Sequence, residues 1–353
     1  MALPTRTRTH RHRWSRPSSS PPPAGPFSPS LVYRPRRPTE TPLYPVVQHH
    51  LETFLAEARS HDADEIPRWV EHDFRRYLTC GILAHGFARL RCDDCAQERL
   101  RAFSCKGRGI CPSCTTRRMA EVGVHLADHV IPYVPVRQWV LSLPKRLRPF
   151  LAHDPVLVGR ILAVLLRVLR RALRDAASDA PPDAALGAVS FLHRFGSSLN
   201  PHIHLHLLVV DGLFARDDEG AVAFHPARAL DAHAARALTP LVQDRLLRLF
   251  VRRSLLPDHQ AHDMRTWRGT GGFSLDGSVR VHAHDRPGLE RLIRYCARPP
   301  FALSRLYAPA GQPALRRSAA TLLYRLPRPL PDGRSALRLN PLELLQRLAR
   351  LIP

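Results

Sequence analysis

Three histidines alternate with apolar residues in the segment from His202 to Val210. In a β-strand, this spacing sends His202, His204 and His206 to one face and the intervening apolar side chains to the other. Histidines two positions apart lie roughly 6.5 Å apart at Cα, so both rings can bind one divalent ion. The pattern therefore predicts a strand with a metal site on one face. The competing interpretation is a row of ordinary surface histidines.

A tyrosine flanked by two arginines is the candidate nucleophile. An aspartate at the N-cap and a proline in the first turn predict a helix that starts at Asp285 and ends before Pro299. On it, Arg291, Tyr295 and Arg298 share one face at spacings of four and three residues. Such cations favour the phenolate, which is rare at neutral pH because the ordinary tyrosine pKa is about 10. The alternative is a tyrosine that only packs.

Two Cys-x2-Cys pairs, separated by fifteen residues, predict a structural zinc site. Each pair brings two thiolates to one ion, and two pairs close a tetrahedron that has no open position for a substrate. A redox pair or a chance arrangement are the alternatives. Cys80 and Cys105 are further thiols that could substitute as ligands or be buried. The predicted zinc ligands are Cys92, Cys95, Cys111 and Cys114.

The charge balance points to a polyanionic partner. The chain has 53 basic and 30 acidic side chains, a net charge of +23, and codon bias that exchanges Lys for Arg leaves this surplus unexplained. Nucleic acid is the leading candidate. The sequence contains no run of about 18 apolar residues, so it predicts no membrane-spanning helix. Basic residues also crowd the cysteine-rich segment, where they can contact phosphates: Arg89, Arg91, Arg99, Arg101, Lys106, Arg108, Arg117 and Arg118.

Composition divides the chain into three parts. Residues 1–45 are rich in Pro, Ser and Arg, have no acid before Glu40, and cannot build a core. Residues 46–130 carry the cysteines, and residues 131–353 carry the histidine strand and the tyrosine helix. Alternating strands and helices joined by short turns indicate an α+β fold. The predicted elements are two helices within Val46–Leu83 separated near Pro67, a strand at Trp139–Leu143, a helix at Pro155–Ala176, and paired strands at Ala188–Phe195 and His202–Val210.

Several strings resemble one family. They run from Cys80 to Cys114, from Gln138 to Leu147, and from Arg194 to Asn200, followed by His204 to His206 and Asp211-Gly212, and then Arg294 to Pro300. In this order they resemble the rolling-circle transposases of the HUH superfamily, specifically the insertion-sequence family numbered ninety-one and its common-region relatives. The resemblance implies an α+β HUH endonuclease domain, with a central antiparallel sheet flanked by helices. A helical and zinc-ribbon-like domain would precede it.

The resemblance also implies a chemistry. His204 and His206 would hold Mg2+ or Mn2+, and Tyr295 would attack single-stranded DNA at the element's ends and target, leaving a 5'-phosphotyrosine. His193 is our candidate for a third ligand, whereas we treat His202 as a neighbour of the site. A DNA transposase of this kind would work in the reducing cytoplasm, at the bacterial nucleoid. Its predicted DNA contacts are Arg291, Arg294, Arg298, Lys106 and Arg108.

Two departures from the family stand out. Some relatives have two tyrosines four residues apart, but Arg291 occupies the position four before Tyr295, so we expect a single-tyrosine enzyme. The chain stops at Pro353, inside an expected helix, so we expect a shortened C-terminus. The main alternative is a zinc-dependent DNA-binding protein without catalysis, a transposase remnant that binds DNA but forms no covalent adduct. A metallohydrolase is a third hypothesis.

Overall fold

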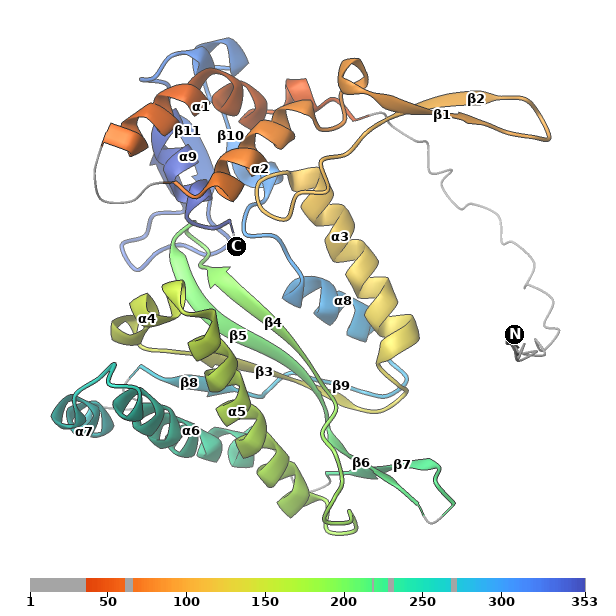
Figure 1. The fold of residues 1–353 in the computed structure, drawn as a ribbon, viewed down its shortest axis with the longest axis vertical. Coiled ribbons are helices and arrows are strands. Elements are labelled where there is room, and N and C mark those ends of the chain that lie inside the picture. Colours follow the sequence, from red (N-terminus) through yellow and green to blue (C-terminus); the bar gives the residue numbers. More distant parts are fainter. Residues whose placement is uncertain (1–35, 61–65, 218, 228–231, 268–271, 353) are drawn as a thin grey trace, which may run out of the picture. The chain divides into compact units, whose positions relative to one another are not determined.

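The computed structural model describes residues 36–60, 66–217, 219–227, 232–267 and 272–352, and Arg37–Pro353 form one compact unit (Figure 1). Most of the expected leader, residues 1–45, lies outside the described residues. The helices are α1 Leu43–Ser60, α2 Arg68–Thr79, α3 Pro112–His125, α4 Arg148–His153, α5 Pro155–Ala176, α6 Ala232–Arg252, α7 Asp258–Thr266, α8 Arg286–Cys296 and α9 Pro341–Ala349. None of these described helices is long and apolar enough to cross a membrane.

The strands form small antiparallel sheets around one larger sheet. In the larger sheet the strand order is β4-β5-β3-β8, and β9 also pairs with β3. Every pairing in it is antiparallel. The strands are β1 Phe87–Arg91, β2 Glu98–Ala102, β3 Val136–Ser142, β4 Ala188–Phe195, β5 Pro201–Val210, β6 Gly212–Arg216, β7 Val222–Pro226, β8 Ser274–Asp276, β9 Arg280–Val281, β10 Leu306–Tyr307, β11 Leu322–Arg325 and β12 Ala336–Leu339.

Helices cover both faces of the larger sheet, which confirms the α+β class. On one face, Leu205 and Leu207 of β5 and Trp139 of β3 join a core with α5, α6 and α7. On the other face, Leu208 packs in a second cluster with Ile293 of α8. Figure 1 shows α5 on one side of the sheet and α8, beside α3, on the other. The apolar reverse face of the histidine strand is therefore buried, as the alternation predicts.

Helix α5 has the bounds that the sequence predicts. The Asp154 side chain accepts a hydrogen bond of 2.8 Å from the backbone N–H of Leu157, and Pro155 occupies the first helical position. A side chain that accepts from this turn satisfies one of the free donors at a helix start. Further along the helix, Ile161 and Leu165 are fully buried in the same core as the sheet residues. The helix is thus fixed by its cap and its apolar stripe.

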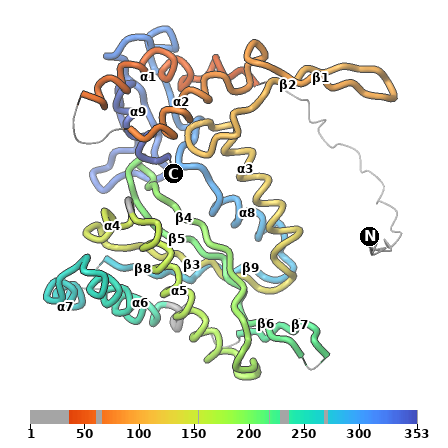
Figure 2. Tube along the Cα trace, in the orientation of Figure 1, coloured from red at the N-terminus to blue at the C-terminus, as the bar shows by residue number. Residues whose placement is uncertain are grey.

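A further core joins the two ends of the described chain. Leu43 and Leu51 of α1 are buried together with Leu344 and Leu348 of α9. The tube in Figure 2 shows α1 and α2 beside the C-terminal segment. Phe195, at the end of β4, belongs to the same core. Residues on both sides of the expected boundary at position 130 therefore share one core, while the boundary itself stays a prediction.

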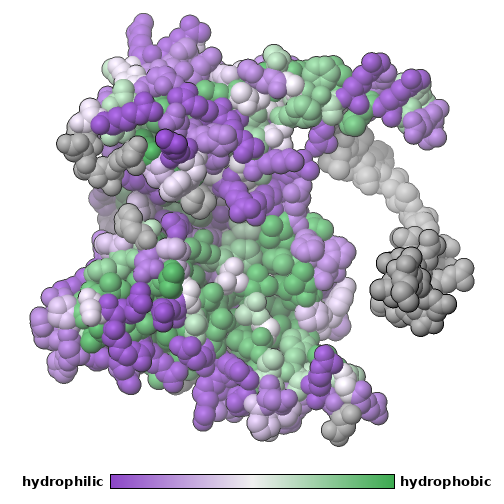
Figure 3. All heavy atoms as spheres, viewed as in Figure 1, coloured by the Kyte–Doolittle hydropathy of each residue, from purple (hydrophilic) through white to green (hydrophobic). Residues whose placement is uncertain are grey.

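Strands β1 and β2 form a hairpin with little buried surface. Arg89 and Glu98 form an ion pair of 2.6 Å across it, and Leu90 and Leu100 are exposed. In the space-filling view, hydrophobic residues gather at its base and hydrophilic ones at its far end (Figure 3). Because neither face is covered by a described helix, side chains at the far end lie in solvent.

A buried ion pair links the start of β3 to the residue that follows β5, and its removal is a test of the fold. Arg137 of β3 donates two hydrogen bonds, of 3.0 and 3.1 Å, to the Asp211 carboxylate. We expect Asp211→Ala to lower the free energy of unfolding by about 3–5 kcal/mol, because a buried guanidinium loses its carboxylate. Asp175→Ala, which breaks an exposed pair with Arg171, should cost less than about 1 kcal/mol. Equal urea midpoints for the two variants would contradict this.

Candidate functional site

Three histidines converge on the face of the sheet that carries α8. His193 of β4 stands directly opposite His204 of β5 in the strand register, and His206 is two residues further along β5. One ring nitrogen from each lies within 4.8 Å of the other two. The ring centroid of His193 is 4.9 Å from that of His204 and 4.3 Å from that of His206. The structure thus brings together the two predicted ligands and the candidate third.

Hydrogen bonds orient each of the three rings. His193 donates from Nε2 to the backbone carbonyl of Cys296 at 2.6 Å, and His204 donates from Nδ1 to the carbonyl of His202 at 3.0 Å. The amide of Gln138 meets Nδ1 of His206 at 3.0 Å. In His193 and His204 the bond uses one ring nitrogen and leaves the other free for a metal, and in His206 this holds when the Gln138 amide turns its carbonyl oxygen toward Nδ1.

Two of the inward nitrogens are buried without a partner. Nδ1 of His193 and Nε2 of His206 make no hydrogen bond within the described part of the chain. A buried polar atom of this kind is costly unless something satisfies it. A divalent cation at the centre would do so for both rings. The donor set therefore fits a metal ion better than it fits a row of surface histidines.

Burial keeps these rings neutral. Desolvation lowers the pKa of His193 to about 4 and that of His206 to about 3, and the nearby Arg298 acts in the same direction. The pKa of His204 is also lowered, first by burial. Neutral imidazole is the form that binds metals. Lone pairs are therefore available at neutral pH without any competition from protons.

Helix α8 carries the tyrosine to the edge of this cluster. The Asp285 side chain caps the helix by accepting from the N–H of Gly288, and Leu289 and Ile293 bury its inner face. Tyr295 on the outer face is 47% exposed, and its ring centroid is 5.7 Å from that of His206. The expected nucleophile and the expected metal ligands are therefore neighbours.

The arginines around Tyr295 differ in their surroundings, and Arg298 lies beyond the end of α8 at Cys296 rather than on the helix, where the sequence predicted it. The Arg298 guanidinium lies 4.5 Å from the Tyr295 ring centroid, so a cation accompanies the phenol as the sequence predicts. Arg294 instead pairs with Glu290 at 2.6 Å, and Arg291 is exposed. Lys106 and Arg108 are exposed on the loop before α3, which belongs to the cysteine cluster rather than to the histidines. These predicted DNA contacts remain predictions.

The sequence did not predict that two further side chains lie beside the histidines. Gln138 of β3 contacts His206, and Arg148, the first residue of α4, lies near His202 and His204 and acts on the pKa of both. Gln138 gave a usable signal, since it is a polar residue that directly precedes the predicted apolar strand. Arg148 gave none, because only the packing of α4 brings it to β5.

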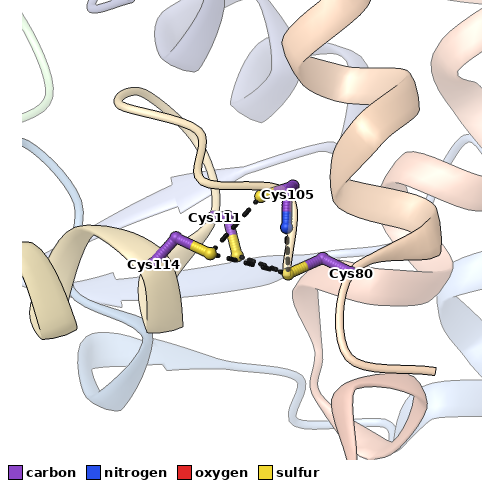
Figure 4. Close-up of side chains that lie close together, drawn as sticks. All are labelled: Cys80, Cys105, Cys111 and Cys114. Atoms are coloured by element: carbon purple, nitrogen blue, oxygen red, sulfur yellow. Dashed lines mark hydrogen bonds between the residues drawn. The ribbon is translucent and has the colours of Figure 1, made fainter. Parts of the chain in front are cut away.

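A second group of potential ligands consists of four cysteine sulfurs. The Sγ atom of Cys80 lies 3.6 Å from the Sγ atoms of both Cys111 and Cys114, and Cys105 lies 3.5 Å from Cys114. Figure 4 shows the four sulfurs pointing toward one another. Thiolates at about 2.3 Å from a tetrahedral zinc ion would be about 3.8 Å apart. The observed spacing therefore suits one zinc ion.

The ends of two helices position this cluster. Cys80 directly follows α2, whereas Cys111 is the N-cap of α3 and Cys114 lies in its first turn. The backbone N–H of Cys105 donates to Sγ of Cys80 at 3.2 Å. Hydrogen bonds from Cys105 lower the pKa of Cys80, whereas hydrogen bonds with Cys105 and the other thiols raise the pKa of Cys111. Four such sulfurs become thiolates together only with a cation among them.

The predicted set of cysteine ligands needs a correction. Cys92 and Cys95 are exposed in the turn between β1 and β2, while Cys111 and Cys114 meet Cys80 and Cys105. Antiparallel pairing of β1 with β2 is the physical reason, because it carries the first Cys-x2-Cys pair to the far end of the hairpin. Spacing alone suggested that the two pairs meet, and the hairpin keeps them apart.

Comparisons with known proteins all point to transposases. Residues 187–353 match the family described as "Putative transposase", and residues 46–143 match the family "Transposase zinc-binding domain". The chain is similar to the transposase for insertion sequence element IS801 of Pseudomonas savastanoi pv. phaseolicola, with 26% identity over 245 residues. That alignment covers 65% of this chain and 56% of the relative, so the chain spans about half of the relative's length. No solved structure matches.

Measuring the zinc content tests which cysteines bind the metal ion. We expect the purified protein to hold about one tightly bound zinc ion per chain, because four thiolates close one tetrahedral site. Cys80→Ser should lose that zinc and some thermal stability. The double variant Cys92→Ser/Cys95→Ser should retain both, since these thiols lie on the exposed hairpin. Metal analysis after gel filtration measures this, and the opposite pattern would restore the spacing-based assignment.

Acid sensitivity tests the burial of the histidines. Because their folded pKa values lie below the ordinary 6.5, the unfolded chain binds protons first as the pH falls. In EDTA, the free energy of unfolding should therefore decrease as the pH drops from about 6.5 toward 4, and these rings should contribute no pH dependence above 6.5. Urea titrations of His206→Leu should show a shallower decrease. Parallel curves for the variant and the wild type would refute the expectation.

Proposed function

We propose that the chain, which is similar to IS91-family insertion-sequence transposases with an N-terminal zinc-binding domain, nicks and rejoins single-stranded DNA through a 5'-phosphotyrosine. The observation that carries the proposal is the contact between Tyr295 and His206 at the edge of a buried three-histidine cluster. A protein with only a structural zinc site would need neither the histidine cluster nor the tyrosine beside it. The combination suits a metal-dependent HUH endonuclease that works by rolling-circle transposition.

The residues have separate tasks in this reaction. His193, His204 and His206 would hold the divalent ion through their inward nitrogens. Mg2+ or Mn2+, when bound there, supplies a positive charge that offsets the charge on the scissile phosphate. The Arg298 guanidinium lies against the Tyr295 ring, where its charge would attract the scissile phosphate. Tyr295 is exposed on its helix, so a strand of DNA can lie across it.

The proposed cleavage step exchanges one phosphoester bond for another. The Tyr295 oxygen forms a bond to the scissile phosphorus while the bond to the 3' oxygen breaks. The phenolic proton passes to solvent, and the departing 3' oxygen takes one up. Because the phosphotyrosyl ester keeps the energy of the broken linkage, a 3'-hydroxyl can attack it and restore a phosphodiester without ATP. One tyrosine serves both steps, since an arginine, Arg291, stands four residues before it.

The zinc cluster has a structural task in this proposal. We assign the zinc ion to Cys80, Cys105, Cys111 and Cys114, which leaves no coordination position for a substrate. The matched zinc-binding family and the sulfur spacing both support a structural zinc ion. DNA is the partner that the transposase family implies, and the excess of basic side chains agrees with it.

Covalent capture of DNA tests the nucleophile. Incubation with Mn2+ and labelled single-stranded oligonucleotides that carry the ends of the protein's own element should give an adduct that survives denaturing electrophoresis. Tyr295→Phe should abolish it, because the phenylalanine ring has no oxygen to attack. Tyr133→Phe is the matched control: Tyr133 is 68% exposed and also lies under an arginine, Arg286, at 4.5 Å. It should leave the adduct unchanged.

Two results would reject the catalytic assignment. One is an adduct that persists in Tyr295→Phe. The other is DNA binding by the wild-type protein without any adduct on its proper ends, which would favour a DNA-binding protein that lacks catalysis.

A further inference from the structure

Cys92 and Cys95 are two exposed thiols at the far end of the β1-β2 hairpin (Figure 1). At the opposite end, the N–H of Gly81 donates to the carbonyl of Phe103, next to the cysteine cluster. Each strand has five residues, so the two ends are about 16 Å apart. Among the described residues, no group of three potential metal ligands includes either thiol. The cysteine cluster therefore does not account for this pair.

Backbone hydrogen bonds hold the two cysteines in one tight turn. The N–H of Ala96 donates to the carbonyl of Cys92 at 3.0 Å, and the N–H of Cys92 donates to the carbonyl of Gln97 at 2.9 Å. The first bond closes a single helical turn, in which residues three apart share one face, with their Cβ atoms roughly 5–6 Å from each other. The Cys92 and Cys95 side chains therefore stand on the same side of the turn.

The backbone of this turn is also arranged to stabilise a thiolate. Ala96, the residue after the pair, has a φ of 54°, in the left-handed region that favours glycine. It returns the chain from the helical turn into β2. Within the turn, the backbone N–H groups of Cys95 and Asp94 donate to the Cys92 sulfur and lower the pKa of that thiol. The thiolate is the form of cysteine that binds metal ions.

Two thiolates provide half of the ligands that a structural zinc ion needs. Such an ion has four protein ligands in a tetrahedron. The other described cysteines are already placed, because four meet in the cysteine cluster and Cys296 is buried in the core with α8. A second copy of the chain brings an identical pair. A two-fold axis through the ion would then give four equivalent thiolates, which makes a closed dimer.

The charges around the turn favour a second copy over DNA. Asp93 and Asp94 lie exposed between the two cysteines, where their carboxylates would repel phosphates. One face of the hairpin carries Arg99 and Arg101 without any acid beside them. The ion pair across the hairpin is formed by other residues, and within the described part of the chain these four side chains have none. A second hairpin supplies the opposite charge for both groups.

We propose that Cys92 and Cys95 bind a zinc ion that is shared with the same two residues of a second copy of the chain. This ion differs from the ion of the cysteine cluster, because it lies at the surface and needs two chains. Two thiolates bind zinc more weakly than four, so a monomer retains only the ion of the cysteine cluster. The thiol protons pass to solvent when the shared ion binds.

The shared ion would bring two nucleophiles into one assembly. This consequence rests on the function proposed above, whereas the zinc-linked dimer itself requires neither Tyr295 nor the histidines. Each chain has one tyrosine at its site, so a dimer has two. Cleavage at two DNA ends could then take place without exchange of protein.

The dependence of molecular mass on zinc tests the shared site. Gel filtration with light scattering, in a phosphine reductant and without DNA, measures the mass of the full-length protein. Added Zn2+ should raise the mass from that of one chain, 39.8 kDa, to that of two. EDTA in an amount equal to the added zinc should restore the monomer, because the exposed ion is removed before the one in the cysteine cluster.

Variants of the turn identify the ligands. Cys92→Ser/Cys95→Ser should remain a monomer at every zinc concentration. It should hold about half a zinc ion per chain less than the wild type, because the histidine cluster can take up zinc equally in both. Cys92→His/Cys95→His is the matched control. It changes the same two positions but keeps two zinc ligands, so it should still form a dimer with added zinc.

Three results would overturn the shared site. The first is a wild-type protein that stays a monomer with added zinc. The second is a dimer that forms equally in EDTA or in the double serine variant. The third is a full zinc ion per chain lost in that variant without any difference in mass, which would mean that one chain completes the site alone. Tyr295→Phe should form the dimer like the wild type, so failure of the adduct and failure of the dimer are separate results.

Discussion

One hydrogen bond joins the two halves of the candidate active site. His193 of β4 donates from Nε2 to the carbonyl of Cys296, the residue that follows Tyr295 on α8. The bond leaves Nδ1 of the same ring toward the other histidines. The orientation of a metal ligand and the backbone position of the nucleophile are therefore set by one contact of 2.6 Å. Because Cys296 and His193 are both buried, solvent does not compete for it.

The zinc-binding region is connected with the same helix. The cysteine cluster holds the start of α3 against the end of α2, and α3 then runs to the outer side of α8. At their contact, a Cβ atom on Gly123 would lie 2.7 Å from Cγ of Arg294. Only glycine lets the arginine side chain cross at this point. A structural metal thus fixes one of the helices against which the tyrosine helix packs.

The sequence predicts those parts of the site that depend on local periodicity. The histidine strand, the bounds of α5 and the cap of α8 follow from spacing and from single capping residues, and the structure confirms them. The cysteine ligands depend on which turns meet in space. The two Cys-x2-Cys motifs are kept apart because β1 pairs with β2 in a hairpin. The spacing of cysteines along the sequence does not reveal such a pairing. Gln138 and Arg148 were missed for the same reason, since neighbouring elements bring them to the histidines.

The core that α1 shares with α9 has a consequence for biosynthesis. Leu43 and Leu51 find their partners Leu344 and Leu348 only after the roughly 300 residues between them have been synthesised. At about 5–20 residues per second, this apolar surface stays open for roughly a quarter of a minute to a minute. During this interval the α1 side chains lack their α9 partners, so the nascent chain carries uncovered apolar surface on its first helix.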